Sequence, residues 1–256
     1  MNRALAVALL AATAAPAAAQ QDFEWRGRIA EGKVIEIRGV NGDVRAVAAA
    51  GNEVTVRAER RGRRDDPRSV RIEVVEHEGG VTICAVYPTP DNARQENECR
   101  PGGGHNSVQR NDVRVEFVVE VPARVRFAGA TVNGDVDADG IGADVRASTV
   151  NGDVDVRTTG FAEARTVNGD IMLRLGRSSF TQDVEFGTVN GSITIEMPEG
   201  LNADFRASTV NGSIDSDFPI TVTGKVSRRS LRGTIGSGGP ELRLSTVNGS
   251  IRLRRI

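Results

Sequence analysis

Four side chains in the first half of the chain have the chemistry of thiol redox centres or zinc sites. Cys84 and Cys99 are the two cysteines of the sequence, and His77 and His105 are its two histidines. Redox-active pairs are normally spaced Cys-x-x-Cys, and zinc sites place their ligands at short regular intervals. The sequence has neither pattern. Because export is expected, as argued below, we predict a disulfide between Cys84 and Cys99, which stabilises the fold by about 3 kcal/mol.

A second set of candidate groups recurs in the second half of the chain. Asp135, Asp153 and Asp170 each follow the glycine of an almost identical motif. If these motifs stack, the carboxylates form a column of repelling charges that needs compensation. The nearby cations that we expect to supply it are Arg157, Arg165 and Arg174. Calcium is the alternative, because hard cations prefer carboxylate ligands, but the calcium-binding nonapeptide repeat is absent.

The motif that carries these aspartates is Thr-Val-Asn-Gly-Asp-Val at residues 131–136. Close copies follow at 149–154, 166–171, 188–193, 209–214 and 246–251, with an early copy at 39–44 and a degenerate one at 230–235. The repeated asparagines are Asn41, Asn133, Asn151, Asn168, Asn190, Asn211 and Asn248, and Arg232 takes their place in the degenerate copy. A period of roughly 20 residues is typical of a solenoid, since one unit cannot bury its own apolar face.

The residues around each copy alternate as they do in β-strands. Counted from the motif valine, positions −5, −3, 0, +4 and +6 are apolar or small, for example Ala162, Ala164, Val167, Ile171 and Leu173. We expect these side chains to face the core. The phase change between −3 and 0 predicts a bend at the threonine, and Asn-Gly accepts the dihedrals of a corner.

The pattern predicts an all-β fold, a parallel β-solenoid (β-helix) over residues 121–256 preceded by an irregular β region at 20–120. Successive coils would lie ~4.8 Å apart, with asparagine amides hydrogen-bonded along the axis. A meander of Asn-Gly hairpins is the alternative, but hairpins do not explain why the flanking residues recur with every copy.

The two ends of such a stack expose unpaired strand edges. Residues 20–120 contain the first copy and four further expected strands, at 53–59, 70–75, 81–86 and 113–121, and they could cover one end. Arg254 and Arg255 could protect the other edge. We interpret the charged loop at 60–68 as a solvated turn rather than an anion site, because two aspartates offset its arginines.

The first residues predict export. Residues 1–19 have a basic start, an alanine- and leucine-rich run and an Ala-x-Ala end, which are the features of a secretory signal peptide. The sequence has no later apolar run long enough to cross a bilayer, so we expect no integral membrane segment in the mature chain and place it in the periplasm or at the cell surface. A net charge of −1 and 4% aromatic residues argue against a nucleic-acid partner.

The signal peptide, the Val-Asn-Gly copies at 40–44 and 132–251 and the short β units resemble the bacterial β-strand-repeat putative adhesin family (domain of unknown function 4097). The resemblance covers roughly residues 30–256. It implies a β-solenoid of the cell envelope with an adhesin label, an unassigned activity and no catalytic residues to transfer. The loop at 84–105 departs from the plain repeat pattern.

The stack lacks histidine, cysteine and the common catalytic motifs. We therefore expect an exported, non-enzymatic envelope protein that acts as a scaffold or contact surface, with no cofactor or metal and with an envelope protein or a glycan as partner. The alternative is a carbohydrate-active β-helix enzyme or a glycan-binding module, because outward arginines and aspartates are available. A third hypothesis is envelope-stress sensing through partner binding.

Overall fold

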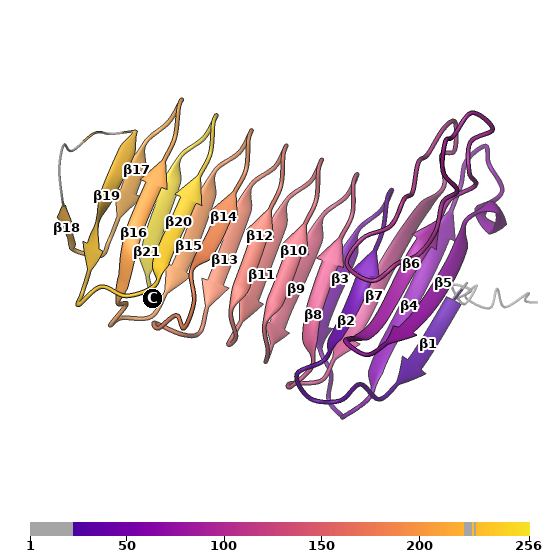
Figure 1. Ribbon diagram of the computed structural model, residues 1–256, viewed down its shortest axis with the longest axis horizontal. Coiled ribbons are helices and arrows are strands. Elements are labelled where there is room, and N and C mark those ends of the chain that lie inside the picture. The colour runs from indigo at the N-terminus through magenta and orange to yellow at the C-terminus, as the bar shows by residue number, and fades with distance from the viewer. Residues whose placement is uncertain (1–22, 223–226, 228) are drawn as a thin grey trace, which may run out of the picture.

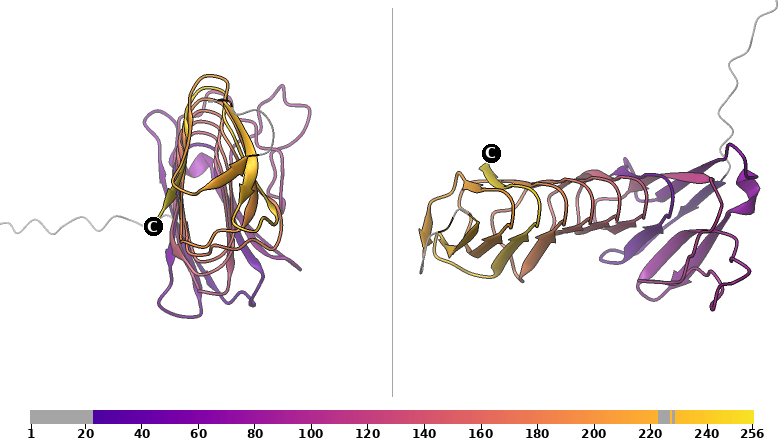
Figure 2. Two further views of the ribbon diagram at one scale, coloured as in Figure 1. Left: turned by 90° about the vertical axis from the view of Figure 1, so that its left-hand side faces the viewer. Right: turned by 90° about the horizontal axis from the view of Figure 1, so that it is seen from above.

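Each close copy of the motif forms one corner of a flattened coil, and the coils stack into a long solenoid (Figure 1). The computed structural model describes residues 23–222, 227 and 229–256. The predicted signal peptide, residues 1–19, lies outside this range. Viewed along the axis, successive coils superimpose on one another (Figure 2). Within the described residues, no helix is long and apolar enough to cross a membrane.

Two sheets form the long walls of the solenoid. Within the described residues, sheet A has ten strands and sheet B has eleven. In spatial order, sheet A consists of β1 (Phe23–Gly27), β4 (Val54–Arg61), β7 (Arg114–Val121), β3 (Val44–Ala48), β9 (Val136–Ile141), β11 (Val154–Thr158), β13 (Ile171–Leu175), β15 (Ile193–Met197), β21 (Ile251–Arg255) and β17 (Ile214–Ser216). Sheet B consists of β18 (Ile220–Val222), β19 (Ser230–Ile235), β16 (Ala203–Ser208), β20 (Glu241–Ser245), β14 (Val184–Gly187), β12 (Ala162–Arg165), β10 (Val145–Ser148), β8 (Arg126–Ala130), β2 (Val34–Arg38), β6 (Gly80–Val86) and β5 (Arg71–His77).

The coils pair in parallel and in the register that the motif predicts. Val154 of β11 lies between Val136 of β9 and Ile171 of β13. The motif asparagines themselves form parallel bridges from coil to coil. The predicted solenoid is therefore confirmed, and the hairpin alternative is excluded for these copies.

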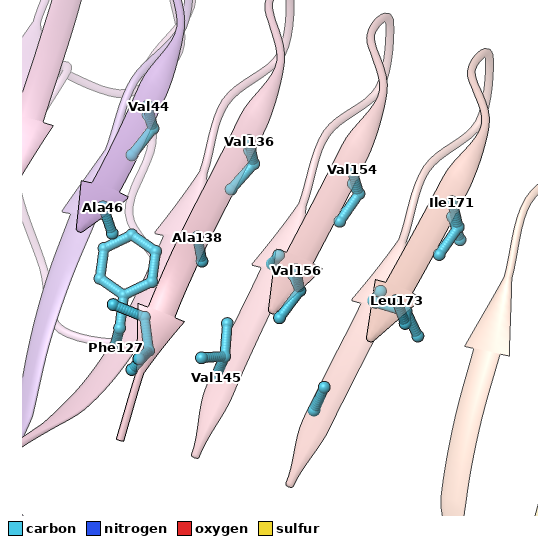
Figure 3. Close-up of a cluster of buried hydrophobic side chains, with 14 of the residues drawn as sticks. Val44, Ala46, Phe127, Val136, Ala138, Val145, Val154, Val156, Ile171 and Leu173 are labelled. Atoms are coloured by element: carbon cyan, nitrogen blue, oxygen red, sulfur yellow. The ribbon is translucent and has the colours of Figure 1, made fainter. Parts of the chain in front are cut away.

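The core lies between the two sheets and is made of the residues that alternate inward. Val136, Val154 and Ile171 form one row and Ala138, Val156 and Leu173 the next, so like side chains stack on like (Figure 3). All are at most 1% exposed. Positions −5, −3, +4 and +6 are thus in the core as predicted, and burying one such Leu or Ile side chain contributes roughly 2 kcal/mol.

The coils do not stack in sequence order. β20 and β21, with the copy at 246–251 between them, lie between the coil of β14–β15 and the coil of β16–β17. Arg254 and Arg255 are therefore inside the stack, and the prediction that they protect its edge is wrong. Arg254 instead pairs with Asp215 of the neighbouring strand β17 at 2.8 Å and with Asp217, the residue after that strand, at 2.9 Å.

The degenerate copy at 230–235 is not a coil of the solenoid. It forms β19, which runs antiparallel to β16 and covers that end of sheet B together with β18. Arg232 consequently has no place in the asparagine column. Without Asn-Gly the segment has no corner, so it continues as one extended strand.

The N-terminal region covers the opposite end, as predicted. β7 and β6 each add one parallel strand to the stack, and β4, β1 and β5 then add antiparallel strands outside them. The charged segment at 60–68 begins with the last two residues of β4 and ends within the short 3₁₀ helix η1 (Pro67–Ser69). The first motif copy, between β2 and β3, lies against the copy at 131–136. Asn133 donates a hydrogen bond to Asn41 across this contact, although the two residues are 92 positions apart in the sequence.

The motif glycine is required because two backbones meet there. A Cβ built on Gly169 would lie 1.9 Å from the carbonyl oxygen of Gly152, and equivalent contacts of 1.9–2.2 Å occur at the other stacked copies. The Gly152 oxygen also accepts a hydrogen bond from the Thr166 hydroxyl at 2.9 Å. The carbonyl cannot move away without losing that bond.

We predict that Gly169→Ala destabilises the protein by about 3 kcal/mol, the upper range for an overpacked interior site. The measurement is the midpoint of denaturant unfolding followed by circular dichroism. Gly51→Ala is the control, since a Cβ at Gly51 meets nothing within 4 Å, and it should leave the midpoint unchanged. Equal midpoints for the two variants would contradict the contact.

Candidate contact surface

The corner of each coil turns the motif valine outward and the motif threonine inward. Thr166 is 5% exposed and Val167 is 39% exposed. The prediction that the valine at position 0 faces the core, with a phase change at the threonine, is therefore wrong. Alternation continues through −5, −3 and −1, and the threonine takes the inner place because its hydroxyl binds the glycine carbonyl of the neighbouring coil. Valine cannot form that bond.

The outward valines form one apolar column along the corner. In spatial order its members are Val132, Val150, Val167, Val189, Val247 and Val210. They are 37–40% exposed along the column and 55% exposed at Val210, the last coil. We call this set the valine column. The equivalent Val40, at the other end, is only 6% exposed.

Val40 is covered by the long loop that precedes β7. Val108 of this loop lines one surface hollow together with Val40 and Val132. The buried Asn97 holds the loop closed: its amide nitrogen donates to the carbonyls of Tyr87 at 3.0 Å and Ser107 at 2.7 Å. One end of the column is thus covered by the chain itself, and the remaining valines are open to solvent.

The asparagines form a second column beside the valines. Each Nδ2 donates to the Oδ1 of the preceding coil at 2.7–2.8 Å, and the order of the column is Asn41, Asn133, Asn151, Asn168, Asn190, Asn248 and Asn211. An amide has two N–H donors and two acceptor lone pairs. Each interior asparagine therefore keeps one donor and one acceptor site for a ligand or for water.

The aspartate column is compensated by the backbone. Asp135 Oδ1 accepts the backbone N–H of Asp153 at 2.8 Å, and Asp153 Oδ1 accepts that of Asp170 at 2.7 Å. Serines continue the same pattern in the later coils, where the Ser192 hydroxyl oxygen accepts the N–H of Ser250. A hydrogen bond from an amide to a carboxylate stabilises the charged form, so adjacent coils can carry aspartate.

The arginines predicted to compensate this column have other partners. Arg157 pairs with Asp139 at 3.6 Å, Arg165 with Glu185 at 3.0 Å and Arg174 with Glu196. These pairs lie on the outer faces of the sheets rather than at the corner. On the same face as Arg157, burial and the neighbouring carboxylates Asp135 and Asp155 raise the pKa of Asp137, while Arg45 lowers it.

The disulfide between Cys84 and Cys99 is present, with its Cα atoms 5.6 Å apart. It joins the long loop to β6. His77 lies within hydrogen-bond distance of the Thr82 hydroxyl at 3.1 Å and accepts the Gly79 N–H. In the part of the chain that the structure describes, no three His, Cys, Asp or Glu side chains are grouped to hold a metal ion.

The charged loop at 60–68 is organised by paired aspartates. Asp112 accepts the backbone N–H groups of Arg64 and Asp65 at 3.1 Å, and the Asp65 carboxylate accepts the Asp112 N–H at 2.8 Å. These backbone bonds lower the pKa of Asp112. The charged loop is thus joined by backbone bonds to Asp112, just before β7, and its interpretation as a solvated turn stays a prediction.

The sequence did not indicate the role of Tyr87, which connects the loop to the stack. Tyr87 is 1% exposed, and its hydroxyl donates to the Val113 carbonyl at 2.6 Å. Burial raises its pKa to about 12. The one sequence feature that could have indicated this role is that Tyr87 is the single tyrosine and lies three residues after Cys84.

Comparison with known proteins gives one family match. Residues 124–254 match the family model described as Toastrack DUF4097. No curated protein matches the sequence.

Solved structures also match the chain, and two of them are described as adhesion proteins. One is described as a putative cell adhesion protein from Clostridium sporogenes, at 10% identity and a TM-score of 0.47, covering 91% of this chain and 99% of that one. The other is described as a putative adhesin from Bacteroides fragilis, at 11% identity and a TM-score of 0.29, covering 91% and 96%. At these identities and scores, neither alignment carries an argument about function.

We predict that Tyr87 titrates near pH 12 in the folded protein instead of near its ordinary value of 10.0. Because the folded state holds this proton more tightly than the unfolded state, the stabilisation is complete below pH 10 and is lost as the pH rises towards 12. Absorbance of the tyrosinate reports this residue alone, since the sequence has one tyrosine. The denatured protein is the control. Titration of the folded protein near 10 would show that the phenol is not buried against Val113.

Proposed function

Because the chain belongs to the Toastrack DUF4097 family, we propose that it is an exported, non-enzymatic envelope protein whose solenoid is a scaffold for an adhesin-like contact surface. The observation that carries the proposal is the valine column. Large contiguous apolar patches on soluble proteins commonly mark binding sites. Here the apolar residues recur at one place in every coil, although the same corner would form with a polar residue in the outward position.

The column has the physical properties of a binding surface. Valine has a single side-chain torsion that is already restricted, and the backbone beneath it is held by hydrogen bonds on both sides in the interior coils, as at Asn168 and Asn190. Little conformational entropy is therefore lost on contact. The adjacent amides provide a polar rim with free donors and acceptors, which resembles the arrangement of protein interfaces.

The disulfide supports the proposed compartment. Cys84 and Cys99 are at most 9% exposed and joined to each other, and such bonds persist in oxidising environments such as the periplasm or the cell surface. The predicted signal peptide at residues 1–19 is consistent with export. Fractionation of cells that express the full chain tests this directly, and retention in the cytoplasm would contradict it.

The distribution of carboxylates supports a non-enzymatic role. Many outward carboxylates on the sheets pair with arginines, either on a neighbouring strand, as in Arg146–Glu163 at 2.9 Å, or on the same strand, as in Arg38–Glu36 at 3.0 Å. Glycoside hydrolysis uses two carboxyl groups facing each other across a sugar-binding site. The test is a release assay with polyuronates and peptidoglycan, and turnover abolished by one Arg or Asp substitution on the stack would replace this proposal with the enzyme alternative.

We predict that Val150→Ser combined with Val167→Ser weakens binding of the purified protein to isolated envelopes by about tenfold, through loss of two buried apolar contacts. The readout is a cosedimentation isotherm. Val74→Ser combined with Val118→Ser is the matched control, because these valines are 36% and 40% exposed but lie outside the column.

Thermal unfolding of both double variants should match the wild type, since all four side chains are exposed. Equal loss of binding in the control, or full binding by the column variant, would show that the column is not the contact surface.

A further inference from the structure

Strands β20, β16 and β19 are neighbours in sheet B near one end of the solenoid (Figure 1). Each of these strands carries one exposed arginine. Arg206 of β16 is directly opposite Arg243 of β20 and Arg232 of β19. All three side chains are exposed. Two residues away from the arginine on each strand, a row of serines occupies the same face: Ser245, Ser208 and, because β19 is antiparallel, the preceding Ser230.

This row departs from the charge pattern of the remaining sheet. Elsewhere on sheet B most outward arginines have a carboxylate partner. The partner is on the next strand in Arg146–Glu163 and Arg165–Glu185, and on the same strand in Arg38–Glu36 and Arg71–Glu73. In the row, Arg243 is bound by Glu241 of its own strand at 2.7 Å. Among the described residues, neither Arg206 nor Arg232 has a carboxylate within ion-pair distance.

The nearest carboxylate on the central strand has another partner. Asp204 accepts a hydrogen bond from the Thr234 hydroxyl at 3.2 Å. Like charges on directly opposite residues destabilise a sheet, so Arg206 between two arginines lowers the stability of the free protein. A bound anion would remove that repulsion.

We propose that the Arg206–Arg232 row and the adjacent serines bind an acidic polysaccharide of the polyuronate class, lying across the strands. Neighbouring strands are ~4.8 Å apart, which is close to the length of one sugar residue, so successive uronates can present one carboxylate to each strand. Guanidinium groups bind carboxylates through two parallel hydrogen bonds. The serine hydroxyls are placed to bind the sugar hydroxyls.

The surroundings favour a glycan over a nucleic acid. On the opposite side of the row from the serines lie Asp204 and Glu241, which repel a polyanion and direct it towards the serine side. The two rows contain no aromatic side chain among their described residues, whereas binding of single-stranded nucleic acid normally uses aromatic stacking. This site is separate from the valine column, so it extends the proposed function and does not depend on it.

The experiment measures binding of the full chain to oligogalacturonate by calorimetry, with a neutral galactan oligosaccharide as the reference ligand. Arg206→Ser and Arg232→Ser should each weaken oligogalacturonate binding about tenfold, as expected for loss of one charge-assisted contact. Arg252→Ser is the matched control. Arg252 is exposed on β21 of sheet A, has no ion-pair partner among the described residues, and its replacement changes the net charge equally.

A folding readout accompanies each variant. Removing one of three adjacent positive charges should leave the thermal midpoint unchanged or raise it, so weaker binding by Arg206→Ser or Arg232→Ser cannot be ascribed to unfolding.

Three results would overturn the proposal: no binding of oligogalacturonate by the wild type, equal weakening by Arg252→Ser, or tighter binding of single-stranded DNA with the same dependence on Arg206 and Arg232. The last would identify a nucleic-acid site. None of these results affects the test of the valine column, which uses different residues and a different ligand.

Discussion

The stack depends on one repeated backbone contact, in which the motif glycine of each coil points its carbonyl oxygen at the glycine Cα of the next coil. The same oxygen accepts a hydrogen bond from the threonine hydroxyl of that next coil. The contact leaves no room for a side chain at the glycine. It also explains why the threonine is buried. Because the threonine hydroxyl and the glycine backbone are held inside the corner, the valine and asparagine between them point outward. The valine column and the asparagine column are the result.

The same geometry accounts for the charge distribution at the corner. Each aspartate that follows the glycine reaches the backbone N–H of its counterpart one coil away, as Asp135 does with Asp153. The carboxylates therefore need no cation from the sheets. Many arginines are left to pair with carboxylates on the flat faces, and Arg206 and Arg232 differ in lying side by side in one row without a carboxylate partner among the described residues.

Much of the fold could be predicted from the sequence because a solenoid converts local periodicity into long-range order. The parallel pairing, the rows at positions −5, −3, +4 and +6 and the disulfide all follow from spacing and residue type. The outward direction of Val167 could not be predicted in this way, because hydrophobicity alone favours a buried valine. The hydrogen bond from Thr166 to Gly152, which places the threonine inside instead, is not apparent from the sequence.

The order of the coils was equally hidden, since every copy carries the same complementary surfaces and none specifies its neighbour. The contact surface and the arginine row could not be predicted from the sequence either, because both consist of residues that become adjacent only when the coils stack. Arg232 and Arg243 flank Arg206 because β19 runs antiparallel and β20 is inserted. In the sequence, these three arginines are separated by 11 to 26 residues and form no recognisable pattern.

The inserted coil at 246–251 makes the order of synthesis matter. Coils up to residue 197 can assemble in chain order, each on its predecessor, but the coil at 203–216 has no parallel partner in sheet A until residues 241–256 are inserted beside it. The last two coils of the stack therefore depend on each other for their parallel pairing. A polypeptide that stops before residue 241 would leave one edge of β14 and one edge of β15 without their parallel partners.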